Sequence, residues 1–263
     1  MPARRETDAL RAALAAAPAI VPEVIATMRA IGGALPAGDG VACFTRLYLA
    51  VTEAVEEELA GGRTTFRRPD VLARLDVVFA ELWFDALRGS LGRPPSVPRA
   101  WAPLVDGRRR TDVAPIQFAL AGMNAHINRD LPVALVRTWE ELGSGPGDRD
   151  VRADYLAVNA LLVETEARVR SQFATGVVGL ADRALGDVDS AVAMWNVARA
   201  CDAAWTNGAT LWRLRDDPEL RDAYLLALDR TTGFAGRGLL RPARPRVARL
   251  AALVRRLTRR RRR

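Results

Sequence analysis

Apolar side chains recur at intervals of three or four residues through much of the chain. Between residues 41 and 60 they repeat on one side of a helix, at Leu47, Val51, Val55 and Leu59. Between residues 69 and 87, Pro69 and Asp70 suit a helix start, and a second stripe follows. The members of that stripe are Leu72, Leu75, Val78, Phe79, Leu82 and Ala86. Both segments are therefore predicted to be amphipathic helices.

Glycine and proline clusters divide the chain into segments of about 15 to 27 residues, which is longer than typical β-strands. Further helices are expected at about 150–173, 188–213 and 217–230. No stretch alternates apolar and polar residues for long, as a half-buried strand would. The pattern predicts an all-α protein, a single multi-helix bundle of about eight helices with a basic C-terminal tail.

The same boundaries suggest three parts along the chain. Residues 1–40 are expected to form an N-terminal helical arm, residues 41–230 a helical core domain, and residues 231–263 an Arg-rich amphipathic tail. We predict that the core is one cooperative unit with a helix at 114–131 in its centre.

The composition is that of a globular protein. With 263 residues and 49% hydrophobic side chains, the chain can bury a substantial core. No uncharged apolar run reaches the roughly 18 residues of a membrane-spanning helix, and charges and prolines interrupt the first thirty residues, where a signal peptide would lie. Cys43 and Cys201 have no CxxC partner and are expected to be buried thiols in a reducing compartment. These features predict a cytoplasmic protein.

Positive charge is concentrated at the C-terminus. Residues 231–263 hold 12 of the 39 basic side chains and no acid, which leaves 27 basic and 31 acidic residues elsewhere. From Val247 onward, arginines surround an apolar helical face made of Leu250, Ala251, Val254 and Leu257. We therefore predict that residues 241–263 bind an anionic membrane surface, at its inner, cytoplasmic face. Nucleic acid is less favoured, because the rest of the chain is mildly acidic and residues 241–263 contain no aromatic residue. The other alternative is a tail that only confers solubility.

The central segment 114–142 has an unusual composition. Ile116, Leu120, Met123, Ile127 and Leu131 form an apolar stripe. The other faces carry no charge from residue 114 to 128, which is typical of a helix enclosed by its neighbours. The polar side chains on it need buried partners, because each unsatisfied group costs about 1 to 3 kcal/mol. These side chains are Gln117, Asn124, His126 and Asn128.

His126 and Asp130 lie four residues apart and share a helix face with small residues. Asp130 could orient His126 as a catalytic acid or base, or both could bind a divalent metal. His126 is the single histidine, so such a metal would be held mainly by carboxylates, which favours iron, manganese or magnesium. The alternative is that Asp130 satisfies His126 inside a polar core network.

Other helices supply candidate partners for this pair. Asp154 and Asn159 border the core side of their helix, and Trp205 faces the core or a pocket. We predict that His126 is buried and touches Asp154, Asn159 or Asp202 across a helix interface, since a buried imidazole needs a hydrogen bond at each nitrogen.

The runs GMNAHINRDLP, ADYLAVNALL and ARACDAAWTNGATL resemble an uncharacterised bacterial all-helical family, a domain of unknown function. The resemblance covers most of residues 40–215, centres on the signature NAHIN-x-DL, and implies no activity. His126 to Pro132 also resembles a His-x-x-x-Asp motif of helical zinc phospholipases and nucleases, but the other histidines of those trinuclear sites are absent. No phosphate loop, GxSxG or HExxH motif is present.

Two functional hypotheses follow. In the first, the protein is a small-molecule enzyme in which His126 and Asp130 perform acid–base or metal chemistry. Asn124, Asn128, Asp154, Asn159 and Trp205 would then bind the substrate. In the second, it is a non-catalytic helical binding or scaffold domain for an apolar small molecule or a partner, associated with the anionic membrane through its tail.

Overall fold

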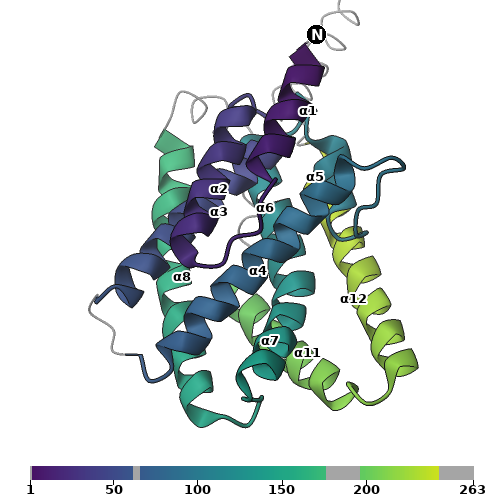
Figure 1. Ribbon diagram of the computed structural model, residues 1–263. Coiled ribbons are helices and arrows are strands. Elements are labelled where there is room, and N and C mark those ends of the chain that lie inside the picture. The colour runs from purple at the N-terminus through teal and green to yellow at the C-terminus, as the bar shows by residue number, and fades with distance from the viewer. Residues whose placement is uncertain (1, 62–65, 176–195, 243–263) are drawn as a thin grey trace, which may run out of the picture.

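The computed structural model describes residues 2–61, 66–175 and 196–242, and every regular element in these ranges is helical. If α6, the π-helical turn η1 and α7 are counted as one continuous helix, nine helices are described, eight of them with seven or more residues. The prediction of an all-α bundle is confirmed (Figure 1). The elements are α1 (Pro2–Ala13), α2 (Val21–Ala34), α3 (Gly40–Leu59), α4 (Pro69–Ser90), α5 (Ala102–Gly107), α6 (Pro115–Ala125), η1 (His126–Asp130), α7 (Leu131–Leu142), α8 (Arg149–Thr175), α11 (Val197–Arg213) and α12 (Pro218–Leu239).

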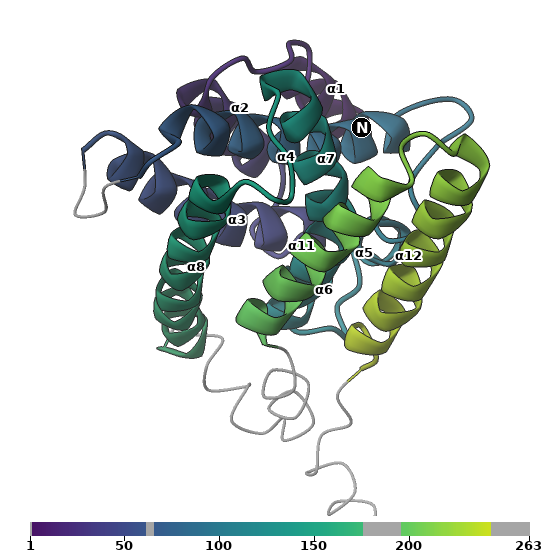
Figure 2. The same ribbon diagram turned by 90° about the horizontal axis from the view of Figure 1, so that it is seen from below.

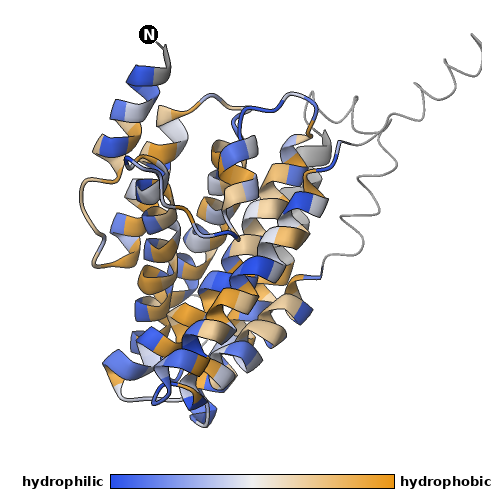
Figure 3. Cartoon of the chain, turned by 90° about the vertical axis from the view of Figure 1, so that its right-hand side faces the viewer, coloured by the Kyte–Doolittle hydropathy of each residue, from blue (hydrophilic) through white to orange (hydrophobic). Residues whose placement is uncertain are grey.

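The segment from α6 through η1 to α7 runs through the centre of the bundle. α6 packs against α3 and α12, and α7 packs against α4 and α11 (Figures 1 and 2). Ten successive residues, 116 to 125, are buried, so the charge-free composition of this helix did indicate enclosure. Hydrophobic and hydrophilic residues alternate along the helices of the bundle (Figure 3).

The expected central helix contains a π-helical turn that its periodicity did not reveal. In this turn the backbone N–H of Leu131 donates to the carbonyl of His126, five residues earlier. Pro132 follows at once, has no N–H of its own, and would crowd the carbonyl four residues before it in a regular α-helix. The wider turn therefore lies where proline disturbs the α-helical ladder.

Both ends of the core differ from the expected boundaries. Leu10, Val24 and Ile31 of the expected N-terminal arm are buried in the same hydrophobic cluster as the central helices. At the other end, α12 continues past residue 230 to Leu239, and Leu240 is buried as well. The hydrophobic core thus includes side chains of α1 and α2 and reaches Leu240, whereas the predicted membrane-binding helix from Val247 onward lies outside the described residues.

No helix in the described ranges combines the length and apolar character that crossing a bilayer requires.

Candidate functional site

The His126–Asp130 pair forms within the π turn and is buried. Oδ2 of Asp130 accepts a hydrogen bond from Trp101 Nε1 at 2.8 Å and lies 3.3 Å from His126 Nδ1. Oδ1 of Asp130 accepts from the Arg129 guanidinium at 2.8 Å. Because a carboxylate can only accept, Nδ1 of His126 carries the proton in this pairing. Each oxygen of Asp130 therefore has a partner, as in the alternative of a polar core network.

Aromatic rings enclose the other sides of His126. Its imidazole stacks on Phe79, with ring centroids 3.4 Å and planes 4° apart, and the Tyr48 ring meets it at 4.5 Å in an edge-on geometry. Burial lowers the pKa of His126 below its ordinary value of 6.5, although Asp130 opposes this shift. The imidazole is thus neutral at neutral pH. Its Nε2 atom has no hydrogen-bond partner among the described residues.

The network continues from the π turn to α12. Arg129 also lies 3.8 Å from a carboxylate oxygen of Asp229 in α12. Asp229 in turn accepts hydrogen bonds from the backbone N–H groups of Arg99 and Ala100, at 2.9 and 3.0 Å. The loop before α5 is therefore hydrogen-bonded to α12 through Asp229, and the Arg129–Asp229 ion pair links the π turn to the same carboxylate.

Side-chain amides of the central helix form hydrogen bonds with the backbone of α12. Asn124 Nδ2 donates to the carbonyl of Thr232 at 3.0 Å, and Asn128 Nδ2 donates to Asn124 Oδ1 at 3.1 Å. Gln117 Nε2 donates to the carbonyl of Leu239 at 2.7 Å. Asn124 and Asn128, which were predicted to bind substrate, are therefore placed at a helix interface, where their hydrogen-bonding groups are used within the protein.

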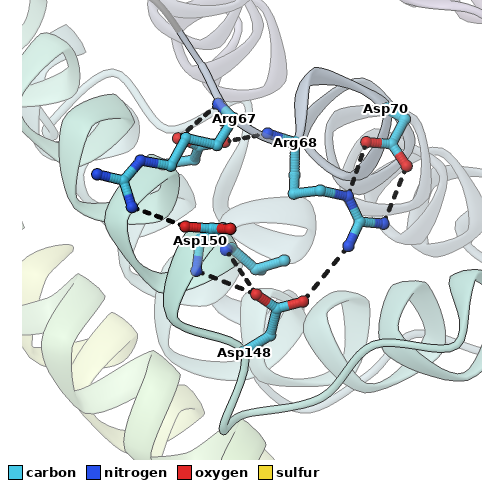
Figure 4. A network of polar contacts seen from close by, with 7 residues as sticks. Arg67, Arg68, Asp70, Asp148 and Asp150 are labelled. Carbon is cyan, nitrogen blue, oxygen red and sulfur yellow. Dashed lines mark hydrogen bonds and ion pairs between the residues drawn. The ribbon is translucent and has the colours of Figure 1, made fainter.

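Asp154 has a different role from the one predicted. Its carboxylate accepts from the backbone N–H groups of Arg67 at 2.9 Å and Arg68 at 2.6 Å, which ties the segment before α4 to α8. Figure 4 shows the surrounding ion pairs, which are Arg67–Asp150 at 2.7 Å, Arg68–Asp70 at 3.0 Å and Arg68–Asp148 at 3.3 Å. This surface network aligns the starts of α4 and α8.

The expected polar contact of His126 across a helix interface is not found. Asp154 is used as described above, Asp202 pairs with Arg152 at 3.3 Å, and no hydrogen bond joins His126 to either of them or to Asn159 in the described ranges. That prediction is wrong in its chemistry, although the burial of His126 is confirmed. Aromatic rings from α3 and α4 occupy the positions where polar partners were expected.

Trp205 packs in a separate aromatic group. Its ring centroid lies 5.1 Å from that of Trp139 and 4.9 Å from that of Tyr155, and the Arg152 guanidinium lies over it at 4.6 Å. These contacts join α7, α8 and α11, and give Trp205 a role in packing.

A cavity of about 60 Å³ lies between α3, α4 and α8, next to the aromatic rings that enclose His126. Phe79 and Tyr48, the two rings closest to His126, form part of its wall. Of the predicted site residues, Asn159 lines the cavity directly. The remaining wall residues are mainly apolar and are Val51, Val55, Leu72, Leu75, Asp76, Leu131, Tyr155, Val158 and Leu162.

Asp76 is the group in this wall that sequence reasoning missed. Its Oδ2 atom is covered and has no hydrogen-bond partner among the described residues. Desolvation, followed by the nearby charge of Glu56, raises the pKa of Asp76 from 3.8 to about 7. The residue as a whole is half-buried. The available signal was an acid inside an apolar stripe, four residues after Leu72 and three before Phe79.

A wider depression of about 400 Å³ lies between α2, α3 and α4. Its charged groups are Glu56 and Arg74, and Arg74 is paired with Glu141. The smaller cavity is the stronger candidate site, because Asp76, with its partnerless carboxylate oxygen, belongs to its wall.

In the described part of the chain, no three His, Cys, Asp or Glu side chains converge as metal ligands would. Both oxygens of Asp130 are used by protein donors. The divalent-metal alternative therefore gains no geometric support, and the contacts of Asp130 are those of the alternative in which it satisfies His126 inside a polar core network.

The fold and this site define an all-α bundle protein whose buried His–Asp pair, at a π turn, supports the wall of a small internal cavity. The chain belongs to the family of unknown function DUF5995, which matches residues 21–242. This confirms the resemblance to an uncharacterised family, and the match covers the whole of α2 to α12. Neither the curated proteins nor the solved structures gave a significant match.

Asp76→Asn is expected to change the dependence of stability on pH. Because the pKa of Asp76 is raised in the folded state, the native protein binds a proton between about pH 4 and pH 7 that the unfolded chain has released. This contribution to stability is complete below pH 4 and is lost as the pH rises through 7. Relative to the wild type, Asp76→Asn should therefore be more stable at pH 8 than at pH 5, by about 2.6 kcal/mol in the free energy of unfolding.

Urea denaturation of both proteins at the two pH values measures this difference. Asp85→Asn, which changes an exposed carboxylate on the same helix, is the control. Equal behaviour of Asp76→Asn and Asp85→Asn would contradict the raised pKa.

Proposed function

We propose that the cavity between α3, α4 and α8 binds a small, largely apolar molecule with one polar group, and that Asp76 exchanges a proton with that group. The observation that carries the proposal is the covered, partnerless oxygen of Asp76 in a mainly apolar wall. Ligand sites commonly combine such walls with a few convergent polar groups. Here those groups are Asp76, Tyr48 and Asn159.

The pKa of Asp76 suits proton transfer at neutral pH. A carboxyl group with a pKa of about 7 is present in both protonation states there, so it can give or take a proton without a large thermodynamic penalty. Burial raises the pKa of Tyr48 well above 10, so its hydroxyl stays protonated and can donate a hydrogen bond to the ligand. Asp76 is thus the proposed acid or base, and Tyr48 the proposed donor.

His126 and Asp130 act as positioning residues in this proposal. The imidazole holds the Phe79 ring by stacking and the Tyr48 ring by an edge contact, and Asp130 fixes the imidazole. A neutral, enclosed imidazole keeps this wall apolar, which helps to maintain the raised pKa of Asp76.

The cavity volume limits the ligand. At about 60 Å³ it is smaller than a cavity of about 150 Å³ that accepts benzene, so it holds only a few non-hydrogen atoms. The ligand is therefore a very small molecule, or the terminal part of a longer one that extends out of the cavity.

The test uses His126 as a reporter, because it is the single histidine and its imidazole NMR signals need no assignment among histidines. Acetone, 2-propanol, isobutyrate and hexanoate are titrated into the wild type, Asp76→Asn and the control Asp85→Asn. We expect at least one probe to shift the His126 signals saturably in the wild type and in Asp85→Asn, and to bind Asp76→Asn about tenfold more weakly.

The pH dependence separates proton exchange from simple binding. The affinity for that probe should change across pH 7 in the wild type and stay constant in Asp76→Asn. Failure of all four probes to shift the signals, or equal binding to Asp76→Asn and the wild type, would overturn the proposal.

A further inference from the structure

The outer side of α12 carries a surface unlike the rest of the helix. Leu226, Arg230, Phe234 and Arg237 follow one another at steps of four, four and three residues, so they share one side of the helix. All four are exposed to solvent, and Phe234 retains 72% of its accessible surface. We refer to these four residues as the α12 basic face.

Charge along α12 changes sign between its two ends. The exposed acids gather in and just before the first turns, at Asp216, Asp217, Glu219 and Asp222. From residue 230 to 241 the charged side chains are all arginine. The preceding acid, Asp229, is partly buried and accepts hydrogen bonds from the loop before α5. The helix dipole favours this distribution of charge, but it gives no reason for a large aromatic ring in solvent.

The basic face leads directly into the arginine-rich end of the chain. The carbonyls of Leu239, Leu240 and Arg241 are held by Gln117 and Arg110, at distances of 2.7 to 2.9 Å, so this end of α12 is fixed to the bundle. Residues 243–263 then supply ten more arginines and no acid. A rigid basic face with exposed apolar side chains and a basic segment therefore lie next to each other in the chain.

We propose that the α12 basic face docks on an anionic lipid bilayer, with Phe234 inserted among the acyl chains, and that the ten arginines that follow in the sequence add to the electrostatic attraction. Arginines would pair with lipid phosphates while Phe234 and Leu226 leave water, which is how interfacial helices bind. The exposed apolar side chains favour a bilayer over nucleic acid, whose phosphates would engage the arginines alone. This docking is independent of the cavity and of Asp76.

The experiment is co-sedimentation of the full chain with vesicles of phosphatidylcholine, alone or mixed with phosphatidylglycerol. We expect binding to the mixed vesicles only, weakened by salt. Removal of residues 243–263 should weaken it about a hundredfold, since each basic residue near the surface contributes to attraction. Phe234→Ala should weaken it about tenfold because its ring no longer leaves water.

Leu220→Ala is the matched control, since Leu220 is 57% exposed on the same helix but lies among the acids. It should bind like the wild type, and both point variants should keep the wild-type melting temperature because the side chains of Leu220 and Phe234 are exposed. The proposal is overturned if the full chain ignores the mixed vesicles, or if Phe234→Ala binds them as well as the wild type. It is equally overturned if the protein leaves the vesicles to bind duplex DNA and the Phe234→Ala variant binds that DNA as tightly as the wild type does.

Discussion

Replacing Asp130 with alanine is expected to lower the free energy of unfolding by about 3 to 5 kcal/mol. The carboxylate is buried and serves three donors from three residues, namely Trp101, Arg129 and His126. Without it, the Arg129 charge, which is only 17% exposed, would lose its closest counter-ion, and the indole N–H of Trp101 would be buried without a partner. A loss of this size is a large part of the total stability of an ordinary domain, which is about 5 to 15 kcal/mol.

Urea denaturation followed by far-ultraviolet circular dichroism measures this loss. Asp112→Ala is the control, since Asp112 pairs with Arg110 at 2.8 Å but is exposed, and its removal should cost at most about 1 kcal/mol. If Asp130→Ala proved as stable as Asp112→Ala, the carboxylate would not be the structural centre of the network. A directly catalytic role for the His126–Asp130 pair would then regain weight.

Replacing Gly122 with alanine is expected to destabilise the protein by about 2 to 3 kcal/mol. An added Cβ would lie 2.3 Å from Cγ and 2.7 Å from Cβ of Phe44, where α6 crosses α3. The Phe44 ring cannot move aside easily, because Trp83 meets it edge-on at 5.1 Å and Trp101 lies 5.3 Å away. Overlap with a fixed ring outweighs the gain in helix propensity of about 1 kcal/mol that alanine normally brings.

Gly33→Ala provides a control of opposite sign. Gly33 is an exposed position near the end of α2, and an added Cβ there would meet nothing within 4 Å. This variant should be unchanged or more stable by up to about 1 kcal/mol in the same denaturation experiment. Equal effects of the two substitutions would show that α3 and α6 pack less closely than the structure indicates.

The buried polar residues of the bundle fall into two groups, one structural and one in the wall of the cavity. The conspicuous polar residues of the central helix, which include His126, Asp130 and Asn124, hold elements of the protein together. The cavity wall beside them contains Asp76, which costs stability at neutral pH because its carboxylate is poorly solvated. Residues that reduce stability without a structural reason are candidates for a functional role.

Local physics explains what the sequence predicted well. The predicted spans 41–60 and 69–87 agree closely with α3 and α4, because burying one side of a helix requires apolar residues every three or four positions. The enclosure of the central helix followed from its lack of charge, since a charged side chain cannot be buried there without a partner. Each of these properties depends on residues that are close together in the chain.

The identity of each partner, in contrast, was decided by the tertiary structure. The sequence indicated that Asn124 and His126 needed partners, but Thr232 and Phe79 come from helices distant in the chain. The raised pKa of Asp76 likewise arises from surroundings contributed by α3 and α8 as well as its own helix. Desolvation and hydrogen-bond pairing depend on which helices meet, and periodicity along one helix carries no information about that. The sequence by itself therefore determined the helices and the enclosure of their polar residues, and the packing of the bundle decided which of them hold the fold and which line a cavity.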